Sequence, residues 1–416
     1  MSLLGDLMTS LFERGENAGF DGKVDGQSIE ELCEALLTSR GEVSGTGLAA
    51  KILGSYVRMN GEQKQEFFAF LTHGLDLDLE RVEVALTAYR QDRDPGTYHR
   101  LMQATEPRRQ ELARRLNQLP GATEKLVAMR RDLKRYLKEH PDLMPLDLDF
   151  RHLFKSWFNR GFLVLRPISW ESPAHILEKI IAYEAVHEIH SWEDLRRRVE
   201  PRDRRCFAYF HPSMPDEPLI FVEVALTRGI ANSIQDLLAE ERVMLAPSQA
   251  DTAVFYSISN CQEGLAGISF GNSLIKQVVR DLSRALPGLK TFVTLSPVPR
   301  LMDWLSTQDK DAPVDPEDLR ITAAHYLTKA RNANDMPLDP VARFHLTNGA
   351  MLHDIHAGAD LSENGMAQSA GIMVNYLYNV SQIDKNHEAF VADRQIAASK
   401  PVKSLANAYE AGQAAD

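Results

Sequence analysis

Cysteine is scarce in this sequence. Its 416 residues include only Cys33, Cys206 and Cys261, an odd number at wide spacing that matches neither a disulfide framework nor a zinc motif. The sequence also has no apolar run near the ~20 residues that a helix needs to span a bilayer, and its N-terminus lacks the charged start, apolar stretch and cleavage site of a signal peptide. We therefore expect a protein of a reducing compartment, the cytoplasm, that does not enter a membrane.

Positive charge is also limited. The chain carries 47 Lys and Arg against 58 Asp and Glu, for a formal net charge of -11. This balance argues against a general nucleic-acid-binding protein, because such proteins present an excess of positive charge to phosphates. We interpret the basic stretches at residues 108–135 and 196–205 as solvated helix faces. With 44% hydrophobic and 25% charged residues, the composition is that of a globular protein with room for two or three domains.

Apolar periodicity divides the chain into two parts. Between residues 28 and 140, apolar residues recur every three or four positions with short Gly and Pro interruptions, a pattern that predicts successive helices. Beyond Pro145, strand-like runs rich in Phe, Tyr, Val and Ile alternate with helical segments, and the turn at residues 212–218 joins two runs into an antiparallel hairpin. We predict an all-helical domain over residues 1–145 and a mixed α/β domain over residues 146–416.

The most informative local pattern is a glycine-spaced loop between a strand and a helix. An apolar strand at residues 253–259 leads to Gly264, Gly267 and Gly271, and a helix follows from about Asn272. Glycines let the backbone turn tightly, and the first amides of a helix have no intrahelical acceptor, so this order of elements predicts a cradle for a phosphate. The loop is neither a P-loop nor a G-x-G-x-x-G fingerprint, and a plain strand-to-helix turn is the alternative.

Six sequence blocks follow one another in the second half of the chain. They are HPSMPDEPLIFVEVALT at 211–227, FYSISNCQEGLAGISFGNSLIKQVV at 255–279, TLSPVP at 294–299, AAHYL at 323–327, DPVARFHLTNGA at 339–350 and QSAGIMVNYLY at 368–378. Together they resemble the malonyl-CoA decarboxylase family. The resemblance implies an α+β fold, in which a helical bundle that mediates assembly into a homodimer or homotetramer precedes a catalytic domain similar to GNAT acyltransferases. It also implies conversion of malonyl-CoA into acetyl-CoA and CO2 without a metal or an organic cofactor.

By this resemblance, the glycine-spaced loop binds coenzyme A. Its backbone amides receive the pyrophosphate, and the residues concerned are Ala266, Gly267, Ile268, Ser269, Phe270, Gly271 and Asn272. Ser257, on the preceding strand, is a further candidate for lining the site. The chain departs from the family in two places. Relatives can carry a glutamate where this chain has Ser269, for which Glu263 is a candidate substitute, and Arg300 follows SPVP where the family commonly has glycine.

The resemblance also assigns the catalytic residues. His345, in ARFHLTNGA, matches the family's catalytic histidine and suits proton donation because imidazole titrates near neutral pH. Ser296, in TLSPVP, is its partner and is expected to bind the malonyl carboxylate. Tyr378 is placed near both, with Tyr376 as the competing choice because strand alternation puts the two tyrosines on one face. Without the family, His345 is interpreted as filling a half-buried strand or turn position, and Ser296 as capping a turn.

Other interpretations stay open from the residues alone. A phosphate loop reports the coenzyme and not the reaction, so an acyl-CoA-dependent acyltransferase on the same fold is one alternative, and a coenzyme A-binding scaffold with a decayed site is another. A covalent acyl-serine at Ser296 is disfavoured because the sequence around it, TLSPVP, is not a G-x-S-x-G elbow. His353, Asp354, His356 and Asp360 are metal-ligand types whose spacing matches no metal motif, and we interpret them as surface or turn residues.

Overall fold

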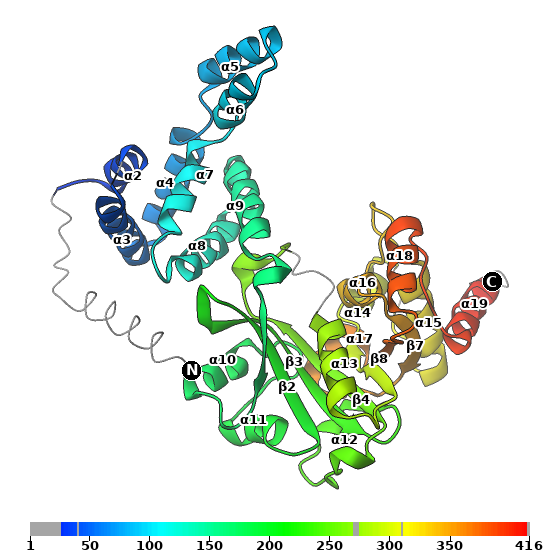
Figure 1. Cartoon of the computed structure of the whole chain (residues 1–416). Helices are drawn as coiled ribbons and strands as arrows, with labels where there is room; N and C mark the ends of the chain where they lie inside the picture. Colours follow the sequence, from blue (N-terminus) through cyan, green and yellow to red (C-terminus); the bar gives the residue numbers. More distant parts are fainter. Residues whose placement is uncertain (1–25, 40, 269–273, 309–310, 414–416) are drawn as a thin grey trace. The chain divides into compact units, whose positions relative to one another are not determined.

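The chain divides into two compact units between Leu153 and Phe154 (Figure 1). The structure, a computed structural model, describes residues 26–39, 41–268, 274–308 and 311–413. The division falls within helix α9 (Met144–Trp157), later than the boundary predicted at Pro145. Pro145 lies in the first turn of α9, where a helix needs no N–H donor, so this proline starts the helix and does not end the domain.

The first unit is helical throughout its described part, which confirms the helical pattern of the sequence. Its helices begin at capping side chains: Ser28 accepts a hydrogen bond from the Glu31 N–H, and Asn60 accepts one from the Gln63 N–H, each in a capping box. The elements before α9 are α2 (Ile29–Thr38), α3 (Glu42–Arg58), α4 (Gly61–Ala69) with a π turn (Phe70–Gly74), α5 (Leu79–Gln91), α6 (Pro95–Ala104), α7 (Arg108–Leu116), α8 (Ala122–Tyr136) and a 3-10 turn (Pro141–Leu143).

The second unit contains a mixed sheet with the strand order β1-β2-β3-β4-β5-β8-β6, in which β7 also pairs with β8. β2 and β3 form the predicted antiparallel hairpin, but β3 already begins at Met214, so the turn is shorter than residues 212–218. The strands are β1 (Val164–Ile168), β2 (Arg204–His211), β3 (Met214–Thr227), β4 (Thr252–Asn260), β5 (Thr291–Thr294), β6 (Ser296–Pro297), β7 (Met351–His356) and β8 (Met373–Leu377).

The parallel strands β4 and β5 separate part of the way along β4. Their pairing ends at Phe255 opposite Thr294, and the next hydrogen bond joins the Leu295 N–H to the Phe255 carbonyl at 3.0 Å. β4 continues to Asn260, whereas the chain after β5 turns to pair with β8 through β6. The two strands thus stop sharing hydrogen bonds, and space opens between them.

Helices cover both faces of this sheet (Figure 1). On one face, α13 packs Ile275 and Val278 against Val222 and Val224 of β3; on the other, α10 and α11 pack against Phe221. Antiparallel strands that lead into a separating parallel pair, followed by a helix, confirm the α+β fold class. The similarity of the second domain to GNAT acyltransferases stays a prediction. The helices are α10 (Ala174–Tyr183), α11 (Trp192–Val199), α12 (Ile234–Leu238), α13 (Leu274–Ala285), α14 (Leu301–Thr307), α15 (Pro316–Lys329), α16 (Pro340–Thr347), α17 (Glu363–Ser369), α18 (Ile383–Asp393) and α19 (Lys400–Gln413), with 3-10 turns at Arg160–Phe162, Pro247–Gln249 and Glu263–Leu265.

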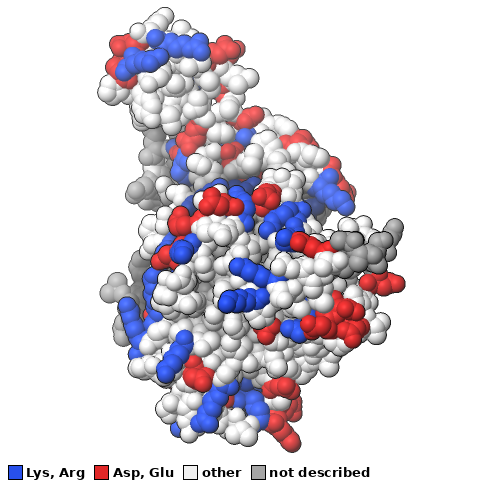
Figure 2. Space-filling view, turned by 90° about the vertical axis from the view of Figure 1, so that its right-hand side faces the viewer, with Lys and Arg blue, Asp and Glu red and all other residues white. Residues whose placement is uncertain are grey.

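Charged side chains of both signs are interspersed on the face shown in Figure 2. The interpretation of the two basic stretches as solvated helix faces is wrong in part, because four of their arginines are buried: Arg109, Arg130, Arg198 and Arg204. Periodicity alone does not reveal a buried carboxylate partner elsewhere in the chain. Among the helices of the described ranges, none combines the length and the apolar character needed to cross a bilayer.

A buried ion pair joins α8 to α9 in the first unit. Arg130 Nε donates to Asp147 Oδ1 at 2.7 Å, and only 2% and 8% of the two side chains are exposed. Removing a charge from water is costly unless a partner compensates it, so this pair constrains how the two helices pack.

We expect Asp147→Asn to lower the free energy of unfolding of the helical unit by about 3 kcal/mol, because Arg130 then stays buried without this carboxylate. Urea unfolding followed by far-ultraviolet circular dichroism measures the change. Asp142→Asn is the matched control: its carboxylate is exposed beside His73, and its loss should cost less than about 1 kcal/mol. Equal effects of the two substitutions would contradict the role of burial.

Candidate active site

Ser296, His345 and Tyr378 form a continuous hydrogen-bonded chain. Ser296 Oγ lies 3.1 Å from His345 Nε2, and Tyr378 OH lies 2.8 Å from His345 Nδ1. The three side chains come from β6, from α16 and from the residue after β8, and all three are buried. The structure therefore brings together the three residues that the sequence nominated from separate blocks.

The hydrogen bonds define where the protons lie in this chain. Ser296 Oγ donates to Thr294 Oγ1 at 2.8 Å, and Thr294 Oγ1 also accepts from the Tyr376 N–H at 3.1 Å. Because the Ser296 proton points to Thr294, Ser296 Oγ accepts from His345 Nε2, and Tyr378 OH donates to Nδ1. His345 is thus a neutral imidazole with its proton on Nε2, facing Ser296.

Burial controls the ionisation of this group. Desolvation lowers the pKa of His345 from 6.5 to about 3, and it raises the pKa of Tyr378 well above its usual value. Both groups are therefore neutral at neutral pH in the protein without ligand. A carboxylate placed beside the imidazole would favour the imidazolium and raise the pKa of His345 again.

The structure distinguishes the two candidate tyrosines. The Tyr376 ring stacks on the His345 imidazole, with centroids 4.4 Å apart and an interplanar angle of 22°. Its buried hydroxyl has no hydrogen-bond partner among the described residues, whereas the Tyr378 hydroxyl bonds to Nδ1. Tyr376 therefore supports the plane of the imidazole, and Tyr378 is the tyrosine that bonds to it.

Helix α16 positions His345. Asp339 caps the helix by accepting the Ala342 N–H at 2.8 Å, and Pro340 occupies the first helical position. His345 is 2% exposed in the last turn of this helix. The interpretation of His345 as a half-buried strand or turn residue is therefore wrong. The Asp-Pro pair in DPVARFHL was the sequence signal for a helix start.

A cavity of about 220 Å³ opens beside Ser296 and His345, where β4 and β5 separate. The remaining walls are mostly apolar; they are Val186, Phe255, Tyr256, Ile258, Asn260, Pro297, Pro340, Val341 and Phe344. A concave, mostly apolar site with a few convergent polar groups is the usual form of a small-molecule site. Sequence reasoning missed Val186 because no motif surrounds it, and it missed Thr294, although Thr294 opens the TLSPVP block.

Part of the predicted phosphate loop lies within the described residues. Gly267 has a φ of 77°, a left-handed conformation that favours glycine. The Ala266 N–H donates to the Glu263 carbonyl at 3.1 Å and the Ile268 N–H to the Leu265 carbonyl at 2.9 Å. The remaining predicted phosphate-binding residues lie outside the described residues: Ser269, Phe270, Gly271 and Asn272.

Ser257 does not line the cavity. Its hydroxyl donates to the Glu184 carboxylate, at 2.8 Å to Oε1 and 2.7 Å to Oε2. The register between β3 and β4 shifts because Tyr256 is an extra residue, a β-bulge. Simple alternation would place Ser257 on the same face as Phe255, but after the bulge Ile258 lines the cavity instead.

The histidine and aspartate group at residues 353–360 is spread along β7 and the following turn. Asp354 lies 3.5 Å from Arg320, and Asp360 accepts the Ser362 N–H at 3.0 Å. Within the described ranges, no group of three or more His, Cys, Asp or Glu side chains is placed to hold a metal ion.

We expect the free energy of unfolding to depend on pH through His345. The unfolded chain binds a proton near pH 6.5, whereas folded His345 stays neutral down to about pH 3. Lowering the pH below 6.5 therefore favours the unfolded state by up to about 1.4 kcal/mol per pH unit. The difference in unfolding free energy between wild type and His345→Gln should shrink as the pH falls from 6.5 and stay level above it. A difference that is independent of pH would contradict this assignment.

Known proteins with similar sequence and structure identify the family. The model described as malonyl-CoA decarboxylase C-terminal domain matches residues 161–322 and 316–415, and the model of the N-terminal domain matches residues 75–158. The crystal structure of malonyl-CoA decarboxylase from Rhodopseudomonas palustris is 48% identical, covers 90% of this chain and 98% of that chain, and superposes with a TM-score of 0.86. The structure from Agrobacterium vitis is 50% identical, with 91% and 99% covered and a TM-score of 0.85. The mitochondrial malonyl-CoA decarboxylase of Anser anser anser is 32% identical over 84% of this chain and 81% of its own length. The chain belongs to the malonyl-CoA decarboxylase family.

Proposed function

We propose that this protein decarboxylates malonyl-CoA to acetyl-CoA and CO2, with Ser296, His345 and Tyr378 as the groups that act on the malonyl end. The observation that carries the proposal is the hydrogen-bonded chain of these three residues beside a mostly apolar cavity. A proton donor in the wall of such a cavity suits a reaction that creates a carbanion equivalent and must protonate it.

The substrate supplies its own electron sink. The electron pair of the bond between the α-carbon and the carboxylate moves into the thioester carbonyl, CO2 leaves, and an enolate remains. The enolate α-carbon then takes one proton and becomes the methyl group of acetyl-CoA. The thioester thus provides the stabilisation for which other decarboxylases use a cofactor, and we propose that no metal or organic cofactor takes part.

The site suits each step of this reaction. Ser296 can turn its hydroxyl from Thr294 toward the malonyl carboxylate and hold it out of the plane of the thioester. The negative charge of the bound substrate favours protonation of the buried imidazole, so His345 takes up a proton from solvent at Nδ1 as the substrate binds, and Tyr378 OH turns to accept a hydrogen bond from it. After CO2 leaves, the proton on Nε2 moves to the α-carbon, and the imidazole is neutral again with its remaining proton on Nδ1, beside Tyr378.

The rest of the chain has supporting roles in this proposal. The loop at residues 266–272 receives the coenzyme A pyrophosphate, and Gly267 gives this loop a left-handed turn. The Ala266 and Ile268 N–H groups donate to Glu263 and Leu265 in the protein without ligand, so they must leave these bonds to take part. The helical unit mediates a homodimer or homotetramer in the cytoplasm. Sedimentation of the purified protein and cell fractionation test these two points.

Product analysis tests the reaction itself. Purified protein incubated with malonyl-CoA alone should yield acetyl-CoA and CO2 in equal amounts, as followed by mass spectrometry. Turnover that requires an added amine acceptor would replace the decarboxylase by an acyltransferase. A labelled acyl-serine at Ser296 would replace the proposed role of its hydroxyl by nucleophilic catalysis.

We expect His345→Gln to lower kcat for CO2 release by about 10²- to 10⁴-fold, the usual contribution of a general acid. Coenzyme A affinity should stay close to that of the wild type, because the imidazole acts on the malonyl end. Steady-state kinetics and calorimetric titration with coenzyme A measure the two quantities. Undiminished CO2 release in this variant would overturn the mechanism.

The two tyrosines provide a matched pair of variants. Tyr378→Phe removes the hydrogen bond to Nδ1 and should lower kcat about tenfold, which corresponds to about 1.4 kcal/mol. Tyr376→Phe keeps the ring that stacks on His345 and removes a hydroxyl without a described partner, so its effect should be smaller. The reverse order of effects would assign the catalytic contact to Tyr376.

A further inference from the structure

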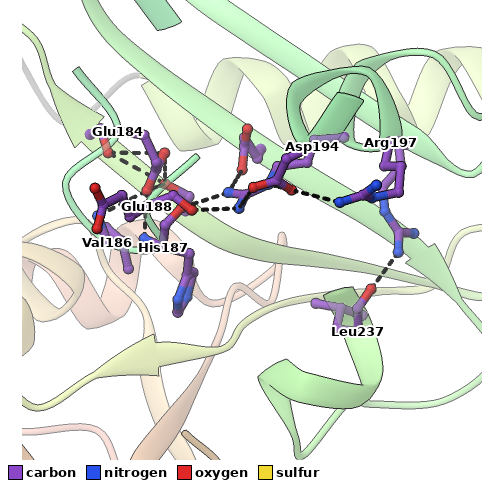
Figure 3. A network of polar contacts seen from close by, with 12 residues as sticks. Glu184, Val186, His187, Glu188, Asp194, Arg197 and Leu237 are labelled. Atoms are coloured by element: carbon purple, nitrogen blue, oxygen red, sulfur yellow. Dashed lines mark hydrogen bonds and ion pairs between the residues drawn. The ribbon is translucent and has the colours of Figure 1, made fainter. Parts of the chain in front are cut away.

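The connection between α10 and α11, residues 184–191, forms one wall of the cavity beside Ser296 and His345. Val186 is the residue of this connection that lines the cavity. It carries no motif and belongs to no regular element, yet Figure 3 shows it within a dense network of polar contacts. Buried charged side chains on both sides of Val186 keep this wall in place.

The Glu184 carboxylate holds the connection from one side. Its Oε1 accepts the backbone N–H groups of Val186 and His187, each at 2.8 Å, and also accepts the Ser257 hydroxyl at 2.8 Å. Glu184 is buried, and Ser257 belongs to β4, so the carboxylate ties the wall to the central sheet. The Ala185 N–H adds a bond to Ser259 Oγ at 3.3 Å.

Arg198, on α11, holds the same connection from the other side. Its guanidinium donates to the His187 carbonyl at 2.7 Å and to the Glu188 carbonyl at 3.0 Å. Asp194 fixes the guanidinium at 3.3 Å, and only 5% of the Arg198 side chain is exposed. Figure 3 shows these contacts as one network that reaches from Glu184 to Asp194. The backbone of the wall therefore has little freedom to retreat from the cavity.

The residues that line the cavity place Val186 beside the acyl group of a bound substrate. Ser296 and His345, the groups proposed to act on the malonyl end, line the same cavity of about 220 Å³ as Val186. The malonyl end of a substrate held by these two residues therefore lies in the space that Val186 borders. A β-branched side chain has a restricted χ1 angle, so Val186 is a firm boundary of this space.

We propose that Val186 is a specificity-determining residue that disfavours malonyl thioesters with a substituent on the α-carbon, and that Glu184, Ser257 and Arg198 are the positioning residues that keep it there. The inference rests on the proposed function for its substrate class. A pocket that discriminates one methyl group by packing reaches about 10- to 200-fold. This range sets the size of the effect that the experiment must detect.

The test compares malonyl-CoA with methylmalonyl-CoA in wild type and Val186→Ala. Loss of two methyl groups from the wall should shift the ratio of kcat/KM values about tenfold toward methylmalonyl-CoA. Val199→Ala is the matched control, since it makes the same truncation next to Arg198 in a core that does not line the cavity, and it should leave the ratio unchanged. An unchanged ratio in Val186→Ala would overturn the proposal.

Binding measurements test the role of Val186 without relying on turnover. In a His345→Gln background, calorimetric titration should show the Kd of methylmalonyl-CoA falling about tenfold relative to that of malonyl-CoA when Val186→Ala is added. If wild type releases no CO2 from malonyl-CoA, the proposed function is wrong. The ratio of the two Kd values, methylmalonyl-CoA to malonyl-CoA, still tests the role of Val186. A shifted ratio supports the inference, and a constant ratio contradicts it.

The test of the positioning residues must measure a quantity that a general loss of packing does not change, and the substrate ratio is such a quantity. Ser257→Ala and Glu184→Gln should shift the same substrate ratio toward methylmalonyl-CoA while the Kd of coenzyme A stays constant. General destabilisation would lower turnover of both substrates equally, and that result would contradict a positioning role. Weaker coenzyme A binding in Ser257→Ala would show that Ser257 contributes to coenzyme A binding, and it would contradict a positioning role for Ser257.

Discussion

The end of hydrogen bonding between β4 and β5 is the constraint on which the site depends. Once the pairing stops at Phe255 and Thr294, each strand must satisfy its backbone elsewhere, and the chain after β5 does so by pairing with β8. This turn carries Ser296 away from β4 and toward His345. The cavity lies in the space that results, between the remainder of β4 and the residues that follow β5. The path of the backbone thus determines where the catalytic side chains can lie.

A neutral, fully buried histidine has two requirements, and neighbouring elements meet both. Each ring nitrogen needs a partner, which Ser296 and Tyr378 supply, and the ring needs a fixed plane, which stacking on Tyr376 supplies. Tyr376 lies in β8, Tyr378 follows the end of β8, and His345 lies in α16. The position of α16 relative to β8 therefore sets the distances between the imidazole and the two tyrosines. The low pKa that burial produces also makes the imidazole sensitive to the charge of an arriving carboxylate.

The sequence predicted what depends on local pattern. Apolar periodicity located the helices of the first unit, and the sequence blocks nominated Ser296, His345 and Tyr378, which the structure brings together. Sequence analysis was wrong where contacts between distant parts of the chain decide the position of a side chain. Ser257 was a candidate for lining the site because of its place on the strand before the loop, but after one extra residue in β4 its hydroxyl bonds to Glu184 instead. Arg130 looked like a surface residue because the carboxylate that compensates it, Asp147, lies on another helix.

The bulge at Tyr256 connects the two halves of the site. By inserting one residue, it directs Tyr256 and Ile258 to the cavity and directs Ser257 to Glu184. The same local irregularity therefore shapes the wall formed by β4 and directs the Ser257 hydroxyl to Glu184, which holds the wall at Val186. Because Glu184 is also bonded to the backbone of Val186, a change in β4 would move both walls together.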